Sequence, residues 1–201
     1  GFVYTTAGDI EGLRELVDRH TCAIMLELIQ GEGGVMALDP EYVQAVRALC
    51  DEKDLVLIVD EVQTGVGRTG TFLCCEHYNL KPDIVTLAKG LGGGLPIGAG
   101  LASKKVEKLQ DTMTPGSHGS TFGGNPVVCA GANVVVDRMD QSFLANVSER
   151  AVQLRAGLAK LPMVKNLSGI GLMVGIEFFG GIQAADVLAA CREKGLLVLT
   201  A

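Results

Sequence analysis

Short apolar runs alternate with amphipathic segments over the first two thirds of the chain. Four nearly all-apolar runs cover residues 22–28, 55–59, 84–88 and 97–102. Between the first two runs, Asp39-Pro40 supplies a helix N-cap followed by proline at the first helical position, which predicts a helix to about residue 51. Short apolar strands separated by helices are typical of a mostly parallel sheet with helices on both faces.

The pattern changes character near residue 140. Asn125-Pro126 predicts a helix to about residue 139, and a second helix, capped by Ser142, should end before Pro162. Strands are then predicted at 164–167, 172–178 and 196–199, with a helix at 184–193. We therefore expect an α/β fold in which residues 1–140 form part of a large domain. Residues 141–201 should form part of a smaller α+β carboxyl-terminal domain.

Composition excludes several classes of protein. The 201 residues carry a net charge of −6, and no cluster of Lys and Arg is interleaved with aromatics, so we expect no nucleic-acid partner. No apolar run approaches the roughly 18 residues that span a membrane. The six cysteines lack the paired spacing of zinc sites or disulfide scaffolds, and Cys74, Cys75 and His77 have no obvious fourth ligand. We expect a cytoplasmic protein with reduced thiols and no metal.

Two charged residues, Asp60 and Lys89, follow predicted strands directly. In open parallel sheets ligands bind beyond the carboxyl ends of the strands, so these two side chains should share a crevice. Alone, such an Asp is more often a cap or a metal ligand, and such a Lys is more often a solvated residue. Together they indicate a cofactor with one electrophilic carbon and one basic ring nitrogen. Pyridoxal phosphate (PLP) has both, an aldehyde that forms an imine with lysine and a pyridine nitrogen that a carboxylate keeps protonated.

Four motifs, in this order and spacing, make the chain resemble the class-III aminotransferases over nearly its whole length. The resemblance is strongest to members that act on acetylornithine. The motifs are Ile29-Gln30-Gly31-Glu32-Gly33-Gly34-Val35, Asp60-Glu61-Val62-Gln63-Thr64-Gly65, Thr86-Leu87-Ala88-Lys89-Gly90 and Gly119-Ser120-Thr121-Phe122-Gly123-Gly124-Asn125-Pro126. Such a resemblance implies part of the fold-type I PLP-dependent transferase large domain.

The resemblance also implies roles for individual residues. Lys89 matches the lysine that forms the imine with PLP and then moves a proton between the substrate and the cofactor as acid and base. Asp60 matches the partner of the pyridine nitrogen. Val62 matches a residue packed on one face of the ring, and Gln63 the side chain that hydrogen-bonds the ring's phenolic oxygen.

Three further residues match positions that handle the phosphate or the substrate. Ser120 and Thr121 match a segment that reaches the cofactor phosphate of a neighbouring subunit, which implies a homodimer with a shared active site. Glu32 matches a glutamate that pairs with an arginine until a dicarboxylate substrate takes that arginine in a bidentate pair. The alternative for Glu32 is a local role in closing a Gly-rich turn.

The function expected from this resemblance is an enzyme. It would move the ω-amino group of N-acetylornithine, or a similar donor, to 2-oxoglutarate through PLP. Ornithine, succinylornithine and 4-aminobutyrate remain alternative donors, because the motifs around Lys89 are widely shared. The resemblance also implies that a phosphate loop, a stacking aromatic and a substrate-binding arginine lie outside this chain. The chain alone would then be an inactive fragment that folds and self-associates.

Overall fold

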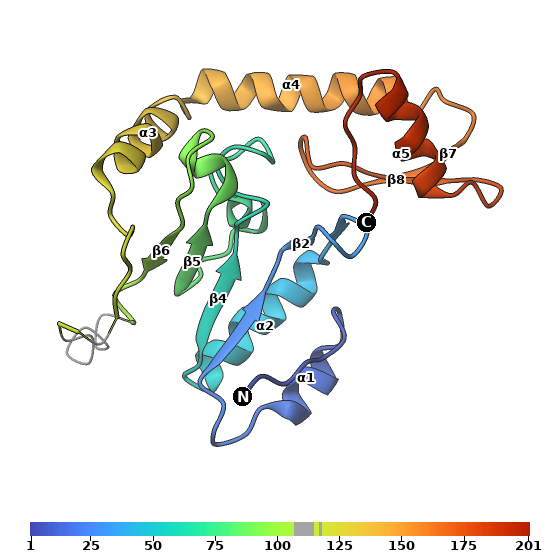
Figure 1. Ribbon diagram of the computed structural model, residues 1–201. Coiled ribbons are helices and arrows are strands. Elements are labelled where there is room, and N and C mark those ends of the chain that lie inside the picture. Colours follow the sequence, from blue (N-terminus) through green and yellow to red (C-terminus); the bar gives the residue numbers. More distant parts are fainter. Residues whose placement is uncertain (107–114, 117) are drawn as a thin grey trace.

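The computed structural model describes residues 1–106, 115–116 and 118–201 (Figure 1). Its main sheet has four strands in the order β1-β4-β5-β6. These strands are β1 (Ala23–Leu26), β4 (Val56–Asp60), β5 (Ile84–Leu87) and β6 (Ala99–Ala102). The first three are parallel, as expected from their apolar runs. The α/β class predicted from the sequence is therefore confirmed.

Strand β6 runs antiparallel to β5, with Leu87 opposite Ala99 and Ile84 opposite Ala102. This direction differs from the parallel one that its apolar run led us to expect. The segment between the two strands contains only the short 3-10 helix η2 (Lys89–Gly92). Parallel strands need a crossover of a dozen or more residues, usually a helix, so this connection turns back on itself instead.

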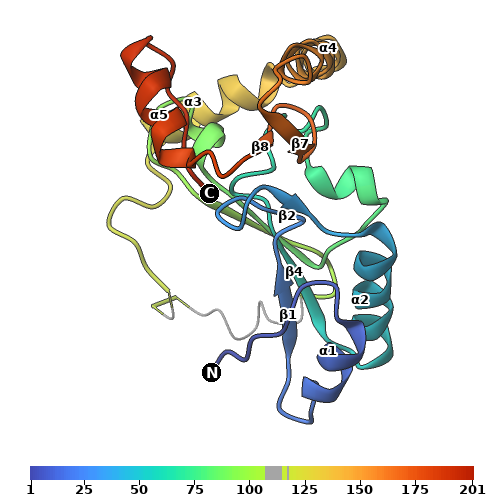
Figure 2. The same cartoon turned by 90° about the vertical axis from the view of Figure 1, so that its right-hand side faces the viewer.

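Two helices cover one face of the sheet. Helix α2 (Pro40–Glu52) begins at Asp39, whose carboxylate accepts the backbone N–H groups of Glu41 and Tyr42. Helix α1 (Ile10–Leu16) is capped in the same way by Asp9, and Figure 2 shows both helices on the same side of the sheet. The side chains between sheet and helix include four that are fully buried, Val43, Val46, Leu57 and Val59.

The strand alternation decides which residues of β4 face this core. Leu57 and Val59 are fully buried, whereas Val56, Ile58 and Asp60 are half-buried on the opposite side. Between β1 and α2 lies a small antiparallel pair, β2 (Ile29–Gln30) and β3 (Met36–Ala37), which the sequence pattern did not predict. The turn between its two strands carries Glu32.

The carboxyl-terminal part follows the predicted element order, with two corrections. It contains α3 (Pro126–Asp137), α4 (Gln141–Leu158), β7 (Val164–Ser168), β8 (Gly175–Phe178) and α5 (Ala184–Glu193). The cap of α4 is Asp140, which accepts the Phe143 N–H at 2.8 Å, and Ser142 instead donates its hydroxyl to Asp140. Residues 196–199 form no strand and are exposed. The domain boundary near residue 140 stays a prediction.

The carboxyl-terminal part packs on two loops of the sheet. Leu172 N donates to Arg68 O at 3.0 Å, and Gly171 (φ +60°) lies so close to Thr69 that an added Cβ would come within 2.5 Å of its backbone. Ser168 Oγ donates to Gly34 O at 3.3 Å. Only glycine allows the approach at position 171. Both contacts lie beside the loops that carry Gln63 and Glu32.

Candidate functional site

Asp60 is the last residue of β4 and lies opposite Thr86 of β5. Its side chain is half-buried, and Oδ1 accepts two hydrogen bonds, from Val62 N at 2.9 Å and from Thr86 Oγ1 at 3.0 Å. Both bonds go to the same oxygen, which leaves Oδ2 without a hydrogen bond to the described residues. The carboxylate is therefore held in a fixed orientation with one oxygen open to a ligand.

Lys89 begins η2 just after β5 ends, so it lies at the same edge of the sheet as Asp60. Parallel neighbours β4 and β5 place their carboxyl ends side by side, as the sequence pattern predicted. The Lys89 side chain is exposed, and its backbone has φ +45°, in the left-handed region that a non-glycine residue rarely occupies. Such strain is maintained by the surrounding structure and is frequent at functional sites.

Gln63 and Glu32 come from different loops and meet at this edge. Gln63 Nε2 donates to Glu32 Oε1 at 3.4 Å, and the Gln63 carbonyl accepts Arg68 Nε at 2.6 Å. An added Cβ at Gly31 would overlap the Gln63 side-chain amide, so glycine at this position makes room for Gln63. Arg68 thereby supports the Gln63 backbone.

Left-handed backbone recurs in the loops around this edge. Besides Lys89, Val35 has φ +57° in the loop after Glu32, and Val66 has φ +55° in the loop after Gln63. A β-branched residue is a genuine outlier in this region. Val66 is held by its packing against the apolar cluster that contains Leu87 and Leu91. These three residues therefore belong to loops that carry a predicted site residue, whereas Asp54 and Asn79, which also have positive φ, do not.

Ser120 and Thr121 stand apart from this group. Both are exposed and lie in the segment that leads from β6 to α3, and Ser120 Oγ accepts Gly123 N at 3.0 Å. Within the described residues, no hydrogen bond joins them to Asp60, Gln63 or Glu32. Val62 is half-buried next to Asp60. The predicted contacts of Val62 with a ring, and of Ser120 and Thr121 with a phosphate, stay predictions.

The sequence interpretation missed Glu61, which is fully buried between Asp60 and Val62. Its carboxylate accepts Thr64 Oγ1 at 2.7 Å and the backbone N–H groups of Cys74 and Cys75 at 2.8 Å each. The two cysteines begin η1 (Cys74–Tyr78). A charged residue directly after a buried strand, with a hydroxyl three positions on, was the available signal.

The two thiols beside Glu61 are buried and have raised pKa values. Burial, and then the negative charge of Glu61, raise the pKa of Cys74 and that of Cys75 to about 12 each. Both thiols therefore stay protonated at neutral pH. His77 instead contacts Thr71 Oγ1 at 3.1 Å. Among the described residues, no group of three or more His, Cys, Asp or Glu could hold a metal ion.

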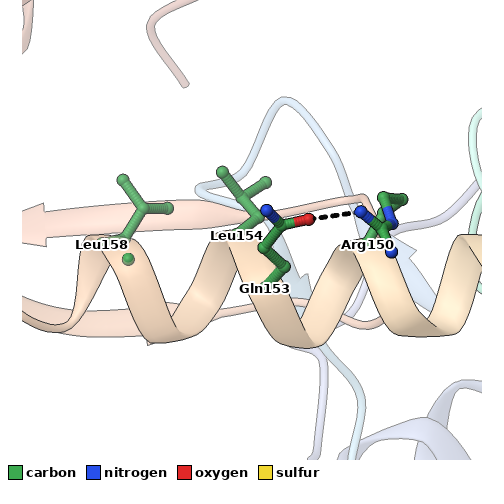
Figure 3. A pocket seen from close by; sticks show the side chains of 5 residues that line it. Arg150, Gln153, Leu154 and Leu158 are labelled. Atoms are coloured by element: carbon green, nitrogen blue, oxygen red, sulfur yellow. Dashed lines mark hydrogen bonds between the residues drawn. The ribbon is translucent and has the colours of Figure 1, made fainter.

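A hollow on α4 is a separate surface feature (Figure 3). Its lining includes Arg150, Leu154 and Leu158, and Arg150 NH1 donates to Gln153 Oε1 at 2.6 Å. None of the predicted site residues lines it. None of the described helices has the length and apolar character needed to cross a bilayer.

Fold and site together define an α/β protein with a lysine and an oriented carboxylate at the carboxyl edge of adjacent parallel strands. Residues 4–201 match the aminotransferase class-III family. The chain belongs to this family.

Individual relatives agree with this assignment. The acetylornithine aminotransferase of Haemophilus ducreyi is 51% identical over 202 residues, which are 100% of this chain and 51% of that protein. The solved N-acetylornithine aminotransferase of Stenotrophomonas maltophilia is 41% identical with a TM-score of 0.78, over 89% of this chain and 48% of that one. The ornithine aminotransferase of Toxoplasma gondii was solved with partial occupancy of PLP at its active site. It is 38% identical with a TM-score of 0.84, over 95% of this chain and 46% of that one. The chain spans about half the length of the curated relatives it matches.

Proposed function

We propose that this chain carries the cofactor-anchoring part of a PLP-dependent aminotransferase. The observation that carries the proposal is that Lys89 and an oriented Asp60 carboxylate lie at the same edge of β4 and β5. Family membership adds the reaction class, because the class-III match covers both residues. The structure contributes the arrangement of the side chains.

The donor set at this edge fits PLP. The open Oδ2 of Asp60 suits a protonated pyridine nitrogen, since a carboxylate stabilises the charged form of a ring N–H. The exposed Lys89 amine suits the aldehyde, and the Gln63 amide, held beside Glu32, suits a phenolic oxygen. When bound, PLP supplies an electron-withdrawing ring that stabilises negative charge on the substrate carbon.

Each of the residues at this edge of the sheet then has a defined task. Lys89 Nζ would hold the cofactor and afterwards carry a proton to and from the reacting carbon as acid and base. Asp60 would keep the ring nitrogen protonated, and Thr86 and Val62 N would keep Asp60 in place. The Val62 side chain would pack on one face of the ring. These tasks require that Lys89 and Asp60 face the same ligand from one edge of the sheet.

The amino donor that we propose is N-acetylornithine, with 2-oxoglutarate as acceptor. The proposal is supported by the acetylornithine aminotransferases among the relatives. Ornithine is the first alternative, because ornithine aminotransferases also share the fold. Glu32 would act as the switch between the two substrates, and its contact with Gln63 brings it next to the proposed cofactor site. Glu32→Gln should therefore raise the KM for the amino donor and lower the KM for 2-oxoglutarate, because the arginine is no longer paired when the dicarboxylate arrives.

A homodimer with a shared active site follows from the same proposal. Ser120 and Thr121 would donate to the PLP phosphate of the partner subunit. Large apolar side chains stay exposed next to them, with Phe122 at 81% and Val127 at 69%. Exposed apolar clusters of this kind are typical of protein interfaces. We further propose a cytoplasmic enzyme with a domain boundary near residue 140.

The test is chemical labelling of the native protein. Borohydride treatment in the presence of PLP, followed by peptide mass mapping, should place the cofactor on Lys89. Lys89→Arg keeps the positive charge but offers no reactive amine, and should lose the label. Lys105, at the opposite end of the sheet, is the internal control and should stay unlabelled. Absence of label on Lys89 in the wild-type protein would refute the proposed function.

A second measurement separates the donors. Initial rates with N-acetylornithine, N-succinylornithine, ornithine and 4-aminobutyrate, each with 2-oxoglutarate, should give the highest kcat/KM for N-acetylornithine. Parallel lines in double-reciprocal plots are expected, because the amino group passes to the enzyme before the acceptor binds. A higher kcat/KM for ornithine would move the proposal to that donor and leave the assignment of Lys89 intact.

A further inference from the structure

Glu61 is a buried charge without an ion-pair partner. It is 0% exposed, and among the salt bridges of the described residues none involves it. Burying a carboxylate without a cation is costly unless hydrogen bonds satisfy it. Three donors do so here, and each is a protein group rather than an open position. Because the Glu61 side chain is fully buried, it cannot reach a ligand directly and acts through its neighbours.

The three hydrogen bonds connect two separate segments. Oε2 accepts both Thr64 Oγ1, from the turn that follows β4, and Cys74 N, while Oε1 accepts Cys75 N. The turn is thereby tied to the first residues of η1. Hydrogen bonds to a charged acceptor are roughly twice as strong as neutral ones, so this connection is rigid.

The backbone of Glu61 fixes the same turn to β5. Its N–H donates to Thr86 O at 3.0 Å, one residue beyond the strand pairing, and its carbonyl accepts Gly65 N at 2.9 Å. An added Cβ at Gly65 would lie 2.7 Å from Leu87 Cδ2 and 2.9 Å from Glu61 O. The turn from 61 to 65 is thus closed tightly against β5. Asp60 precedes this turn and Gln63 lies inside it.

We propose that Glu61 is a positioning residue that fixes Asp60 and Gln63 relative to each other, so that both meet the cofactor ring without rearrangement. This inference rests on the proposed function. Thr86 is the common element, because its hydroxyl orients Asp60 while its carbonyl holds the Glu61 backbone. Loss of the Glu61 carboxylate would release the turn from η1 and let Gln63 move away from the ring. Preorganisation of this kind increases binding affinity, because the turn is already ordered when the ligand binds.

The test compares two equivalent substitutions in the native protein. Glu61→Gln keeps the size of the side chain but turns an NH₂ group toward the N–H donors of η1. The control is Glu76→Gln, because Glu76 belongs to the same 3-10 helix and accepts one backbone N–H, that of Leu73 at 2.8 Å, but is exposed and does not touch the turn. PLP is titrated into cofactor-free protein to obtain its dissociation constant, and the melting temperature of the cofactor-free protein is measured in parallel.

Glu61→Gln should raise the dissociation constant for PLP about tenfold, the equivalent of one well-placed hydrogen bond. The pH dependence of the absorbance of bound PLP should also shift, since Asp60 would hold the ring nitrogen less well. Glu76→Gln should leave both unchanged. An unaltered dissociation constant with a lowered melting temperature would show a purely structural role and overturn the inference.

If Glu61→Gln does not fold, Thr64→Val tests the positioning role of Glu61 instead. It removes only the bond between the turn and the Glu61 carboxylate and leaves both bonds to η1. A severalfold rise in the dissociation constant is expected, and no rise would refute the inference. If the wild-type protein itself does not bind PLP, the proposed function fails, which is a different result from equal binding by wild-type protein and variants.

Discussion

Two aspartates, Asp60 and Asp83, lie at opposite ends of the same pair of strands. Asp83 precedes β5 at the amino edge of the sheet and is almost fully buried. Its Oδ2 accepts Leu57 N at 2.8 Å and Arg47 NH1 at 2.9 Å, and Lys105 Nζ lies 3.9 Å away. Asp60, at the carboxyl edge, has two neutral donors on one oxygen, and none of the salt bridges among the described residues involves it.

The difference separates a structural carboxylate from a functional one. The charge of Asp83 is balanced within the chain, by one guanidinium and one ammonium group. The charge of Asp60 is oriented but not balanced, so a cationic ligand can complete it. Substitution of Asp83 should therefore affect mainly the free energy of unfolding, and substitution of Asp60 mainly the reaction.

The largest effect is expected for Asp60→Ala in the native protein. Turnover should fall by about 10³-fold or more, because a charge aimed at the reacting group is lost. Some PLP should stay bound through Lys89, and the melting temperature of the cofactor-free protein should change little. Steady-state kinetics and thermal unfolding measure the two quantities. Turnover within a factor of a few of the wild type would contradict the role of Asp60.

Asp83→Ala should have the opposite profile. Arg47 is left with a buried charge and the Leu57 N–H without an acceptor, which should cost about 3 kcal/mol of unfolding free energy. Urea unfolding measures this loss. The matched control is Asp51→Ala, because Asp51 also pairs with Arg47, at 2.7 Å, but its side chain is 66% exposed. Its loss should cost about 0.5 kcal/mol. Equal losses for both variants would remove the distinction between the two edges.

Local sequence signals were sufficient for much of the fold. The helix predicted at 184–193 matches α5, and α2 begins at Pro40 as its cap predicted. The cap and the 3.6-residue periodicity of these helices are local properties. The strand predicted at 196–199 did not form, because an apolar run makes a strand only where another strand pairs with it. The β2–β3 hairpin has two residues per strand, which is too short to show a pattern.

The site, like the fold, contains some residues that local sequence signals predict and some contacts that they do not. Asp60 and Lys89 could be predicted because the carboxyl ends of parallel strands share one edge. The contacts of Glu61 with η1 and of Asp83 with Arg47 join residues 13 to 36 positions apart, and no periodicity encodes such pairs. The two aspartates look alike in the sequence, as acidic residues next to apolar runs. Only the donors around them distinguish their tasks.

The contribution of Asp83 to the free energy of unfolding should depend on pH. Burial acts to raise the pKa of Asp83, but the Leu57 N–H and the Arg47 guanidinium outweigh it and hold the pKa below its usual 3.8. Because the folded pKa is depressed, the stabilisation is complete above pH 3.8 and is lost as the pH falls through the folded pKa. Urea unfolding of wild-type protein and Asp83→Asn between pH 6 and pH 2.5 should give curves that converge at low pH. A constant difference across this range would show that the charge of Asp83 contributes nothing.

The smallest effect is expected for Lys105→Met. Lys105 Nζ donates to Leu55 O at 2.7 Å and lies 3.6 Å from Asp54 and 3.9 Å from Asp83. Its side chain is 31% exposed, so water screens part of the attraction, and Met retains most of the packing of the stem. We expect a loss of about 1 kcal/mol in urea unfolding, against almost none for Lys104→Met on the exposed neighbouring position.

Lys105→Met also shows which cation balances the charge of Asp83 at the amino edge. If Arg47 provides most of the balance for Asp83, removal of Lys105 leaves the buried pair intact, and Asp83→Ala remains the more costly change. If Lys105→Met costs as much as Asp83→Ala, the ammonium group and not the guanidinium group balances the carboxylate. The amino edge would then depend on a long, partly exposed side chain, and the contrast with the open carboxylate of Asp60 would be one of degree.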